Sequence, residues 1–576
     1  MARGGGRMKV LGLNFSNDAA AALVVDGVVR GAVQEERFSR RKHDAGFPHR
    51  ALNWCLRDAG LTLRDIDAVG FFWNPGIHAE PANGRLASVP RDHLEYLYNV
   101  PVHLMRAFDG VGVERVEQVL HLDDGHALRT HFLRHHLCHA AGTFFRSNFE
   151  RAAILTVDGY GERASTHIAR GVGRAIETLL EIEFPHSVGS FYAALTQYLG
   201  FKANSGEGKV MGLASYGEPI YADALRKLVH FHDGGFELDL SYFSFFLPRR
   251  RRYTDKLVAL LGPERAPESA IDKRHEDIAA SLQLVAEELL LHLARIARRL
   301  SGESRLAMAG GVTLNCVANG RIRREVGFED CYFMPAASDA GTALGAALYV
   351  SHCLGDVARV AQPQTDALGP HDDDDAIERV LKVSGCVYRR SADIAEDAAA
   401  LLAQGHIVGW YQGRAEYGPR ALGNRSILAD ARPAEMKDTL NARVKFREYF
   451  RPFAPVVPEA EAAGWFGVEH PTPYMLEAHP VPAATAPSLG AVTHVDGTAR
   501  VQTIRRDQNE RYHDVVAAFG RRTGVPVLVN TSFNIRGEPV VNTVAEALRC
   551  FFTTDMDALA IGSFLLVKPH VGSEAG

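Results

Sequence analysis

The sequence predicts an α/β protein of two or three domains, the first of which contains a duplicated α/β core. A length of 576 residues is more than a single hydrophobic core usually organises. Near the start, the strand MKVLGLNF is followed by the two-strand segment AAALVVDGVVRGAVQEERF. A related order of strand, acidic glycine turn and strand appears again in AAILTVDGYGERASTHIAR. This repetition indicates two similar halves with a cleft between them.

The first repeat contains a clear hairpin signal. Asp26 and Gly27 lie between two apolar runs, and an Asp-Gly pair in that setting is typical of a tight turn between antiparallel strands. The actin, hexokinase and Hsp70 ATPase folds are built from such duplicated cores, and we expect this fold here. Phosphates would then lie between the two hairpins, where glycines and backbone N–H groups permit close approach.

The segments after the second repeat alternate between helical patterns and glycine turns. PHSVGSFYAALTQYLGF predicts a helix, and the glycine-rich SGEGKVMGLASYG follows it. A strand, RLAMA, then leads through Gly310 and Gly311 into a helix, an order that places backbone donors where a nucleotide phosphate can bind. Between these segments, a long amphipathic helix is predicted by apolar residues at three- and four-residue spacing: Ile278, Leu282, Val285, Leu289, Leu293, Ile296 and Leu300.

A domain boundary is predicted after residue 355. Residues 356–375 lose periodicity and gain proline, glycine and aspartate, as linkers do. We therefore predict a first domain over 1–355, a linker over 356–375 and a second α/β domain over 376–576. The second domain contains the strands HIVGWYQG and VPVLVN, a basic segment NARVKFREYFRPFAP, and the polar loop TSFNIRGEPV.

Two histidines and two acids predict a metal site in the first domain. His135 and His139 are four residues apart, so on a helix both imidazoles lie on one face and can reach one ion. Asp158 and Asp339 each stand in a glycine-containing segment after a predicted strand. A mixed nitrogen and oxygen site of this kind suits iron, manganese or zinc.

Composition narrows the class of protein. Hydrophobic residues make up 46% and charged residues 23% of the chain, as in ordinary globular proteins, and the net charge of −5 gives no general attraction to nucleic acid or acidic membranes. Seven scattered cysteines fit a reducing compartment, and no apolar run is long enough to span a bilayer. The start, MARGGGRMKV, lacks the apolar core of a signal peptide. We therefore expect a cytoplasmic protein.

Many long motifs, in one order, resemble the O-carbamoyltransferase family of antibiotic and nodulation-factor biosynthesis, which includes tobramycin-type, cephamycin-type and nodulation enzymes. The resemblance covers nearly the whole chain. The motifs are EERFSRRKH, HHLCHA, VDGYGE, GEGKVMGLASYG, AGGVTLN, SDAGTALGAA, RAEYGPRALGNRSI and NTSFNIRGEP.

The resemblance implies an ATP-dependent enzyme with two sites. The second domain would resemble the synthase that makes threonylcarbamoyl-AMP for tRNA, and would convert carbamoyl phosphate and ATP into carbamoyl-AMP, phosphate and pyrophosphate. The first domain would resemble the metal-containing transferase of that pathway. It would pass the carbamoyl group to a hydroxyl of a small molecule and leave AMP. Mg²⁺ is expected with the ATP.

The resemblance also assigns residues. The metal ligands, with iron favoured, would be His135, His139, Asp158 and Asp339. In the first domain, the adenylate would be held by Lys209, Gly206, Gly208, Gly310, Gly311 and Asn315. In the second domain, carbamoyl phosphate and nucleotide would be bound by Arg420, Lys445, Arg500, Asn530 and Ser532, with help from Arg447 and Arg451. Of these, Lys445, Arg420, Arg500 and Ser532 are expected to be catalytic.

Two positions need separate comment. Asn534 alternates with Asn530 and Ser532 just after an apolar strand, where short polar side chains can orient a planar carbamoyl group. In the first loop, many family members have His-Asp, whereas this chain has Asn17 and Asp18. If that histidine serves as base for the acceptor hydroxyl, Asp18 or a base carried by the substrate must serve in this chain, and we list Asp18 but not Asn17 as catalytic.

Other functions compete with this interpretation. A sugar or acid kinase would need only the first domain and would make ADP. A threonylcarbamoyl transferase for tRNA would need a basic face, which the net charge does not favour. A third alternative is an ATP-binding scaffold without catalysis. The acceptor is expected to be an antibiotic, with an aminoglycoside weakly favoured by Glu80 and Asp92 in a variable loop, and homo-oligomer formation is left open.

Overall fold

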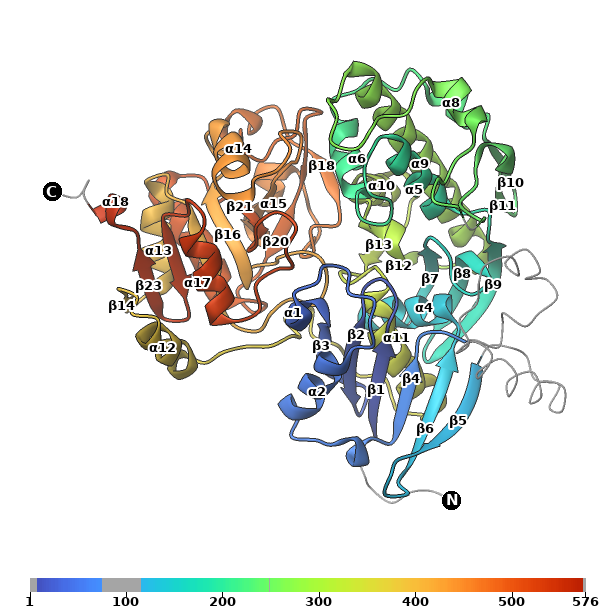
Figure 1. The fold of residues 1–576 in the computed structure, drawn as a ribbon, viewed down its shortest axis with the longest axis horizontal. Coiled ribbons are helices and arrows are strands. Elements are labelled where there is room, and N and C mark those ends of the chain that lie inside the picture. Colours follow the sequence, from blue (N-terminus) through green and yellow to red (C-terminus); the bar gives the residue numbers. More distant parts are fainter. Residues whose placement is uncertain (1–7, 75–114, 248, 573–576) are drawn as a thin grey trace. The chain divides into compact units, whose positions relative to one another are not determined.

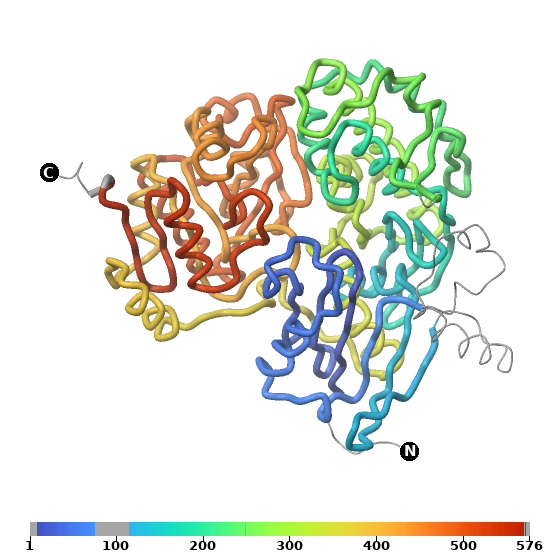
Figure 2. Tube along the Cα trace, in the orientation of Figure 1, coloured from blue at the N-terminus to red at the C-terminus, as the bar shows by residue number. Residues whose placement is uncertain are grey.

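A computed structural model describes residues 8–74, 115–247 and 249–572 (Figures 1 and 2). The chain forms two compact units. The first comprises Met1–Glu35 and Ala45–Pro363, and the second comprises Glu36–Asp44 and Gln364–Gly576. The loop with Glu80 and Asp92, which we expect to contact the acceptor, lies outside the described residues.

The first unit begins with a mixed sheet in the order β3-β2-β1-β4-β6-β5 (Figure 1). The pairs β1–β2 and β2–β3 are antiparallel, β1–β4 and β4–β6 are parallel, and β5 is antiparallel to β6. Asp26 and Gly27 both have positive φ in the β2–β3 turn, which confirms the predicted hairpin. The strands are β1 (Lys9–Asn14), β2 (Ala20–Val25), β3 (Val28–Gln34), β4 (Ala68–Phe71), β5 (Arg115–His121) and β6 (Ala127–Leu133).

A second sheet, in the order β13-β12-β7-β8-β9, repeats this plan. Here too an antiparallel meander is followed by two parallel strands, with β7–β8 and β8–β9 antiparallel and β7–β12 and β12–β13 parallel. The matching order and directions confirm the duplicated α/β core of the actin and Hsp70 type. The strands are β7 (Arg151–Val157), β8 (Ala164–Val172), β9 (Ala175–Glu183), β12 (Arg305–Ala309) and β13 (Asp330–Phe333).

Helices α4 (His135–Arg146) and α11 (Ala340–Tyr349) pack against each other between these sheets. Small residues make the contact close. A Cβ added at Gly345 of α11 would lie 1.8 Å from the carbonyl oxygen of Cys138 on α4, and one added at Gly12 of β1 would lie 1.8 Å from that of Ala343. Helix α11, which is rich in small residues, therefore packs directly on the sheet, and it brings the starts of α4 and α11 together.

Of the remaining elements of the first unit, α2 (His49–Asp58) packs on β2 and β3 of the first sheet, and α9 (Lys273–Ser301) contacts β7 and β8 of the second. The predicted long amphipathic helix is α9, whose apolar face is buried from Ile278 to Ile296, whereas Leu300 near its end is 43% exposed. The others are α5 (Val188–Tyr198), α6 (Glu207–Ala214), α7 (Ala222–Arg226), β10 (Val229–His232), β11 (Gly235–Leu238), α8 (Asp255–Leu261) and α10 (Cys316–Glu325).

The second unit is a mixed α/β structure around a sheet in the order β14-β23-β22-β15-β16-β21-β17-β20. The strands are β14 (Arg389–Arg390), β15 (Val408–Tyr411), β16 (Arg425–Asp430), β17 (Ala454–Pro458), β20 (Gln502–Ile504), β21 (Leu528–Ser532), β22 (Ala558–Ile561) and β23 (Phe564–Val567). A separate two-stranded ribbon pairs β18 (Ala478–Pro480) with β19 (Thr498–Arg500).

Two hydrophobic clusters form the core of this unit. One contains residues of α13 (Ile394–Ala403) and α16 (Glu510–Thr523), which pack against each other. The other contains residues of α12 (Asp374–Val383), α14 (Glu435–Leu440), α15 (Glu459–Phe466) and α17 (Val544–Phe552). Short helices α1 (Glu36–Ser39) and α18 (Pro569–Gly572) complete the unit.

Among the described residues, no helix combines the length and apolar character needed to cross a bilayer. All seven cysteines are free thiols. The thiol of Cys138, which stands between His135 and His139 in the sequence, is fully buried, and burial raises its pKa well above the usual value, so it packs as an apolar side chain.

Candidate functional site

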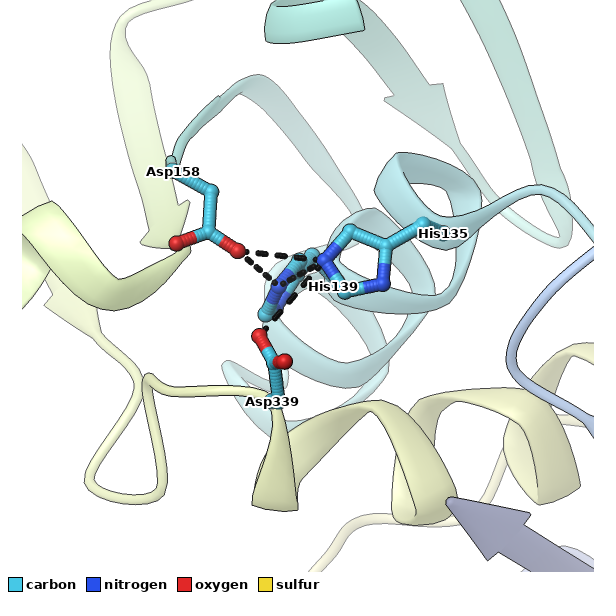
Figure 3. A group of neighbouring side chains, drawn as sticks. All are labelled: His135, His139, Asp158 and Asp339. Carbon is cyan, nitrogen blue, oxygen red and sulfur yellow. Dashed lines mark hydrogen bonds and ion pairs between the residues drawn. The ribbon is translucent and has the colours of Figure 1, made fainter. Parts of the chain in front are cut away.

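The first turn of α4 carries both predicted histidine ligands. His135 and His139 are buried, and the helical spacing aims both imidazoles at one point (Figure 3). The backbone N–H of His135 donates to the Glu162 carboxylate at 3.0 Å, and that carboxylate also accepts the backbone N–H of Asn74 at 2.6 Å. Glu162 thus anchors the start of α4.

The two acids come from the ends of other elements. Asp158 directly follows β7, and its Oδ1 accepts the backbone N–H of Gly311 at 3.1 Å. Asp339 is the N-cap residue of α11, and its Oδ2 accepts the hydroxyl of Ser16. One oxygen of each carboxylate therefore accepts a hydrogen bond from the protein, and the other oxygen faces the histidines (Figure 3).

The four ligand atoms converge at distances that suit one ion. The Nε2 of His135 lies 3.1 Å from Asp158 Oδ2 and 3.6 Å from Asp339 Oδ1, and the Nε2 of His139 lies 3.3 Å from Asp158 Oδ2. Ligand atoms bound tetrahedrally at about 2.1 Å are about 3.4 Å apart. All four ligand atoms lie within 4.8 Å of one another. The residues present therefore fit a divalent metal.

The protonation states of the four candidate ligands depend strongly on one another. Burial opposes protonation of His135, but the hydrogen bond to Asp158 and the charge of Asp339 raise its pKa to about 9. Burial, together with the charge of Asp158, raises the pKa of Asp339 to about 7. Burial and the neighbouring His135 lower the pKa of His139. Without an ion the site holds extra protons, which a metal would displace.

The neighbouring His136 has a structural role. Its Nδ1 lies 2.7 Å from Thr156 Oγ1 and its Nε2 lies 3.1 Å from the carbonyl oxygen of Ala164, so both ring nitrogens are used inside the protein. Burial lowers its pKa well below the usual value, which keeps the ring neutral. His136 therefore orients α4 on the sheet.

Asp18 lies beside the cluster. Its carboxylate accepts the hydroxyl of Ser338 at 2.8 Å, and its charge contributes to the raised pKa of Asp339. Asn14 joins the two loops, because its side-chain amide donates to the carbonyl oxygens of both Asp18 (3.2 Å) and Asp339 (2.5 Å). Asn17, by contrast, is exposed.

The glycine turn after β12 supports the acid cluster. Gly310 has φ +93°, and a Cβ there would lie 2.2 Å from the carbonyl oxygen of Val157, so only glycine fits. The following Gly311 supplies the N–H that holds Asp158. The turn thus has a structural role at the predicted metal site, beside its predicted role in nucleotide binding.

The other predicted adenylate residues lie near this turn. Cys316, which follows Asn315, places its Sγ 4.0 Å from the Sδ of Met211 on α6, the helix that begins after Gly206 and contains Gly208 and Lys209. The side chain of Asn315 caps α10 and bonds Gln283 at 3.0 and 3.1 Å. A Cβ at Gly208 would meet no atom within 4 Å.

In the second unit, Lys445 organises the end of β21. Its Nζ donates to the carbonyl oxygens of Ser532 (2.6 Å) and Asn534 (2.8 Å) and to Asn534 Oδ1 (2.6 Å). The Ser532 hydroxyl also donates to Asn534 Oδ1, at 2.7 Å. Burial and the charge of Arg447 lower the pKa of Lys445 well below its usual value. The structure therefore brings three predicted residues together.

Three predicted arginines, each partly buried, form a cationic cluster. Burial lowers the pKa of Arg447, and the charges of Arg451 and Arg500 lower it further. Burial also lowers the pKa of Arg451; the charge of Glu448 raises it, and the charge of Arg500 lowers it. The Nε of Arg500 is buried and has no hydrogen-bond partner within the described ranges. Such an arrangement is stabilised by bound anions.

Asn530 connects β20 to the loop with Arg420. Its side-chain nitrogen donates to the carbonyl oxygen of Ala421 at 3.1 Å and to Gln502 Oε1 at 2.8 Å. Its Oδ1 is buried and accepts no hydrogen bond from the part of the chain that the structure describes. An N–H group of a ligand could donate to it.

Several residues that shape the two sites were not predicted. Ser16 and Glu162 hold the metal cluster, although Glu162 stands in a motif that the resemblance includes. Arg40 donates to the carbonyl oxygens of Pro539 (2.9 Å) and Val540 (2.8 Å), and the charge of Lys42 contributes to the lowered pKa of Lys445. The run of basic residues in SRRKH was the available signal for Arg40 and Lys42.

Comparison with known proteins gives consistent matches. Two family models match the chain, Carbamoyltransferase N-terminus over residues 9–348 and Carbamoyltransferase C-terminus over residues 399–568. The chain is 41% identical to an uncharacterized protein of Synechocystis sp., over 97% of this chain and 96% of that one. It is 40% identical to the nodulation protein NolNO of Sinorhizobium fredii, over 97% of this chain and 80% of that one.

Among solved structures, the chain is similar to component A of (R)-2-hydroxyglutaryl-CoA dehydratase from Acidaminococcus fermentans. The sequence identity is 14% and the TM-score is 0.32, over 60% of this chain and 99% of that one.

Proposed function

Because the chain belongs to the carbamoyltransferase family, we propose that it forms carbamoyl-AMP in its second unit and transfers the carbamoyl group to a small-molecule hydroxyl in its first. Carbamoyl phosphate and water give carbamate and phosphate. Carbamate and ATP then give carbamoyl-AMP and pyrophosphate. Attack by the acceptor hydroxyl on the carbamoyl carbon expels AMP and forms the O-carbamoyl product, and the hydroxyl proton passes to a base.

The partly buried cationic cluster of Arg447, Arg451 and Arg500, with the buried Lys445 beside it, is the observation that supports adenylation in the second unit. Carbamate is a poor electrophile and becomes reactive as a mixed anhydride with AMP. Making that anhydride from ATP and carbamoyl phosphate brings several phosphate charges together. Arginine binds phosphate through paired N–H donors, so these guanidinium groups are suited to hold the reactants.

Individual roles follow from the contacts. Arg500, whose Nε is unpaired in the described structure, binds phosphate with Arg447 and Arg451. The unpaired Oδ1 of Asn530 accepts an N–H of the carbamoyl group. Lys445 orients Ser532 and Asn534 toward that group. Arg420 contributes a further cation, and Mg²⁺ accompanies the ATP.

Transfer takes place at the histidine and aspartate cluster of the first unit. His135, His139, Asp158 and Asp339 would hold a divalent metal, iron in our proposal and manganese or zinc as alternatives. The ion would supply Lewis-acid polarisation of the carbamoyl oxygen.

The protein itself supplies the base and the adenylate site. Asp18, which lies beside Asp339, accepts the proton of the attacking hydroxyl. The adenylate is held along the glycine segments described above, by Lys209, Gly206, Gly208, Gly310, Gly311 and Asn315.

For the acceptor we propose an antibiotic, with an aminoglycoside as the first candidate. A nodulation-type sugar is the second candidate, because a relative that matches 97% of this chain is a nodulation protein. Both present hydroxyl groups of similar reactivity. A screen of the two classes with the purified protein and carbamoyl-AMP formed in place would identify the acceptor by its mass increase.

The experiment that tests adenylation omits the acceptor. Pure protein is mixed with MgATP and carbamoyl phosphate, and pyrophosphate and AMP-containing products are followed. The proposal requires pyrophosphate release that depends on carbamoyl phosphate. Formation of ADP would support the kinase alternative instead, and absence of any turnover would support the scaffold alternative. Salt-dependent binding of tRNA would favour the tRNA-modifying alternative.

A further inference from the structure

A second group of metal-ligating side chains lies in the second unit, apart from the residues assigned above. His470 follows α15 in a loop, and Glu477 and His479 flank Ala478 at the start of β18. The three side chains offer ligand atoms that all lie within 4.8 Å of one another. Their types, two imidazoles and one carboxylate, form a ligand set common at zinc sites.

Both imidazoles face the same carboxylate oxygen. The Nε2 of His470 lies 3.1 Å from Glu477 Oε2, and the Nε2 of His479 lies 3.5 Å from it. These separations are close to the value of about 3.4 Å for atoms that share one tetrahedral ion at bonds of about 2.1 Å. The three residues are therefore arranged as ligands already, before any side chain moves.

Burial distinguishes this group from surface charges. The side chains of Glu477 and His479 are 4% and 7% exposed. The Nε2 of His479 is buried without a hydrogen-bond partner in the described part of the chain, and it points at the carboxylate oxygen. A buried ring nitrogen without a hydrogen bond is unfavourable, and coordination of an ion would remove this cost.

The remaining side of the group is open. The side chain of His470 is 28% exposed, whereas its partners are buried. An ion held by three protein ligands needs a fourth, and water can reach it from the side of His470. Zinc sites that keep one coordination position open to solvent have three protein ligands and one water.

The group also has a defined relation to Arg500. In the β18–β19 ribbon, Ala478 pairs with Arg500 and His479 pairs with Ala499. Successive residues of a strand point to opposite faces, so Glu477 and His479 lie on one face of the ribbon and Arg500 points to the other. An ion on the first face would fix the ribbon that carries Arg500.

We propose that His470, Glu477 and His479 form a second metal site, which binds a divalent cation that prefers imidazole and carboxylate ligands, with Zn²⁺ as the first candidate. The ion joins the loop after α15 to the β18–β19 ribbon. Its function is to brace the ribbon behind Arg500. The site requires no particular reaction of the enzyme, so it stands or falls independently of the proposed carbamoyl transfer.

Cobalt(II) provides the test, because it replaces Zn²⁺ and its visible absorption reports an imidazole and carboxylate environment. Metal-free full-length protein is titrated with Co²⁺, and bound metal per chain is counted after removal of the excess. The wild type is expected to bind two ions and His139→Ala one. His470→Ala, chosen because this side chain is partly exposed, is also expected to bind one, and the double variant none.

Two further variants sharpen the result. Glu477→Gln keeps the shape of the side chain, removes its charge and is expected to lose the same ion as His470→Ala. His230→Ala removes an exposed histidine of β10 and should still bind two. Circular dichroism verifies that each variant is folded.

A thermal measurement provides an independent readout. Zn²⁺ should raise the Tm of His139→Ala, because ligands that bind the folded state stabilise it, but should leave the Tm of the double variant unchanged. The proposal is overturned if His470→Ala binds as many ions as the wild type with the same absorption. It is equally overturned if His139→Ala, which lacks a ligand of the first site, binds no ion.

Discussion

The Nε2 atoms of His135 and His139 lie 3.1 Å apart, and both face the same oxygen of Asp158. Between two neutral imidazoles at this distance, one nitrogen must donate and the other must accept, and only one of them can then donate to Asp158. A cation at the point where the three atoms converge would let both nitrogens act as acceptors. This relationship, which is built on the first turn of α4, leads to our first prediction.

Replacement of His139 by alanine should remove one bound metal ion and reduce carbamoyl transfer by about 100-fold or more, because a fixed cation at the carbamoyl oxygen stabilises the transition state. Metal analysis and an acceptor assay measure the two effects. Pyrophosphate release in the second unit should persist. His121→Ala, at an exposed position of β5, serves as the control. Unchanged metal content in His139→Ala would contradict the assignment.

Replacement of Lys445 by alanine should reduce pyrophosphate release by about 100-fold or more, because Ser532 and Asn534 lose the donor that orients them. Bound metal at the first unit should remain. Lys382→Ala removes an exposed lysine of α12 that pairs with Glu378 and should behave as the wild type. If Lys445→Ala released pyrophosphate at the normal rate, adenylation would have to occur elsewhere.

Metal affinity at the first unit should increase with pH. The pKa of Asp339 is raised to about 7 and that of His135 to about 9 in the metal-free protein, and a metal binds only the deprotonated ligands. Below pH 7 the ion must displace protons from both groups, and above pH 9 from neither. Isothermal titration with Mn²⁺ at several pH values should show affinity rising across this interval. A constant affinity would mean that these residues are not the ligands.

Replacement of Gly345 by alanine should destabilise the first unit by about 1–3 kcal/mol, because the added methyl group would overlap the carbonyl oxygen of Cys138. Gly464 offers a matched control inside α15, since a Cβ there meets no atom within 4 Å. Gly464→Ala should be neutral or stabilising by about 0.5–1 kcal/mol. Denaturant unfolding measures the free energy of unfolding of both variants. If Gly345→Ala were as stable as the wild type, α4 and α11 could move apart at little cost.

Replacement of Asp18 by asparagine should reduce transfer by about 10²–10⁴-fold, the usual contribution of a general base. Pyrophosphate release and bound metal should be retained. A hydroxyl acceptor of lower pKa should recover part of the lost rate, since it needs less help in losing its proton. If the variant loses metal instead, then Asp18 acts by supporting Asp339, beside which it lies.

The sequence predicts most of the metal cluster for simple reasons. The i and i+4 spacing of His135 and His139 depends only on helix geometry, and Asp158 and Asp339 stand at strand and helix ends, which the pattern locates. The duplicated core is likewise predicted by the Asp26–Gly27 hairpin and its repeat.

Other features depend on tertiary contacts that no local pattern contains. Ser16 bonds Asp339 across more than three hundred residues of sequence. The donors of Lys445 are engaged by Ser532 and Asn534, so this residue orients a loop as well as carrying charge. The sequence also does not predict that Glu36–Asp44 belongs to the second unit, because local helix and turn patterns do not indicate which hydrophobic core a segment packs against.

The assignment of Glu36–Asp44 to the second unit has a consequence for folding during synthesis. Arg40 in Glu36–Asp44 is synthesised about five hundred residues before its partners Pro539 and Val540. Domains usually fold as units during synthesis, from the N-terminus onward. The first unit can therefore complete its sheets before residues 36–44 find their partners. The second unit is complete only when this segment binds to it. A fragment that begins after Pro363 therefore lacks part of its own fold, and adding a peptide of residues 36–44 should restore stability to it.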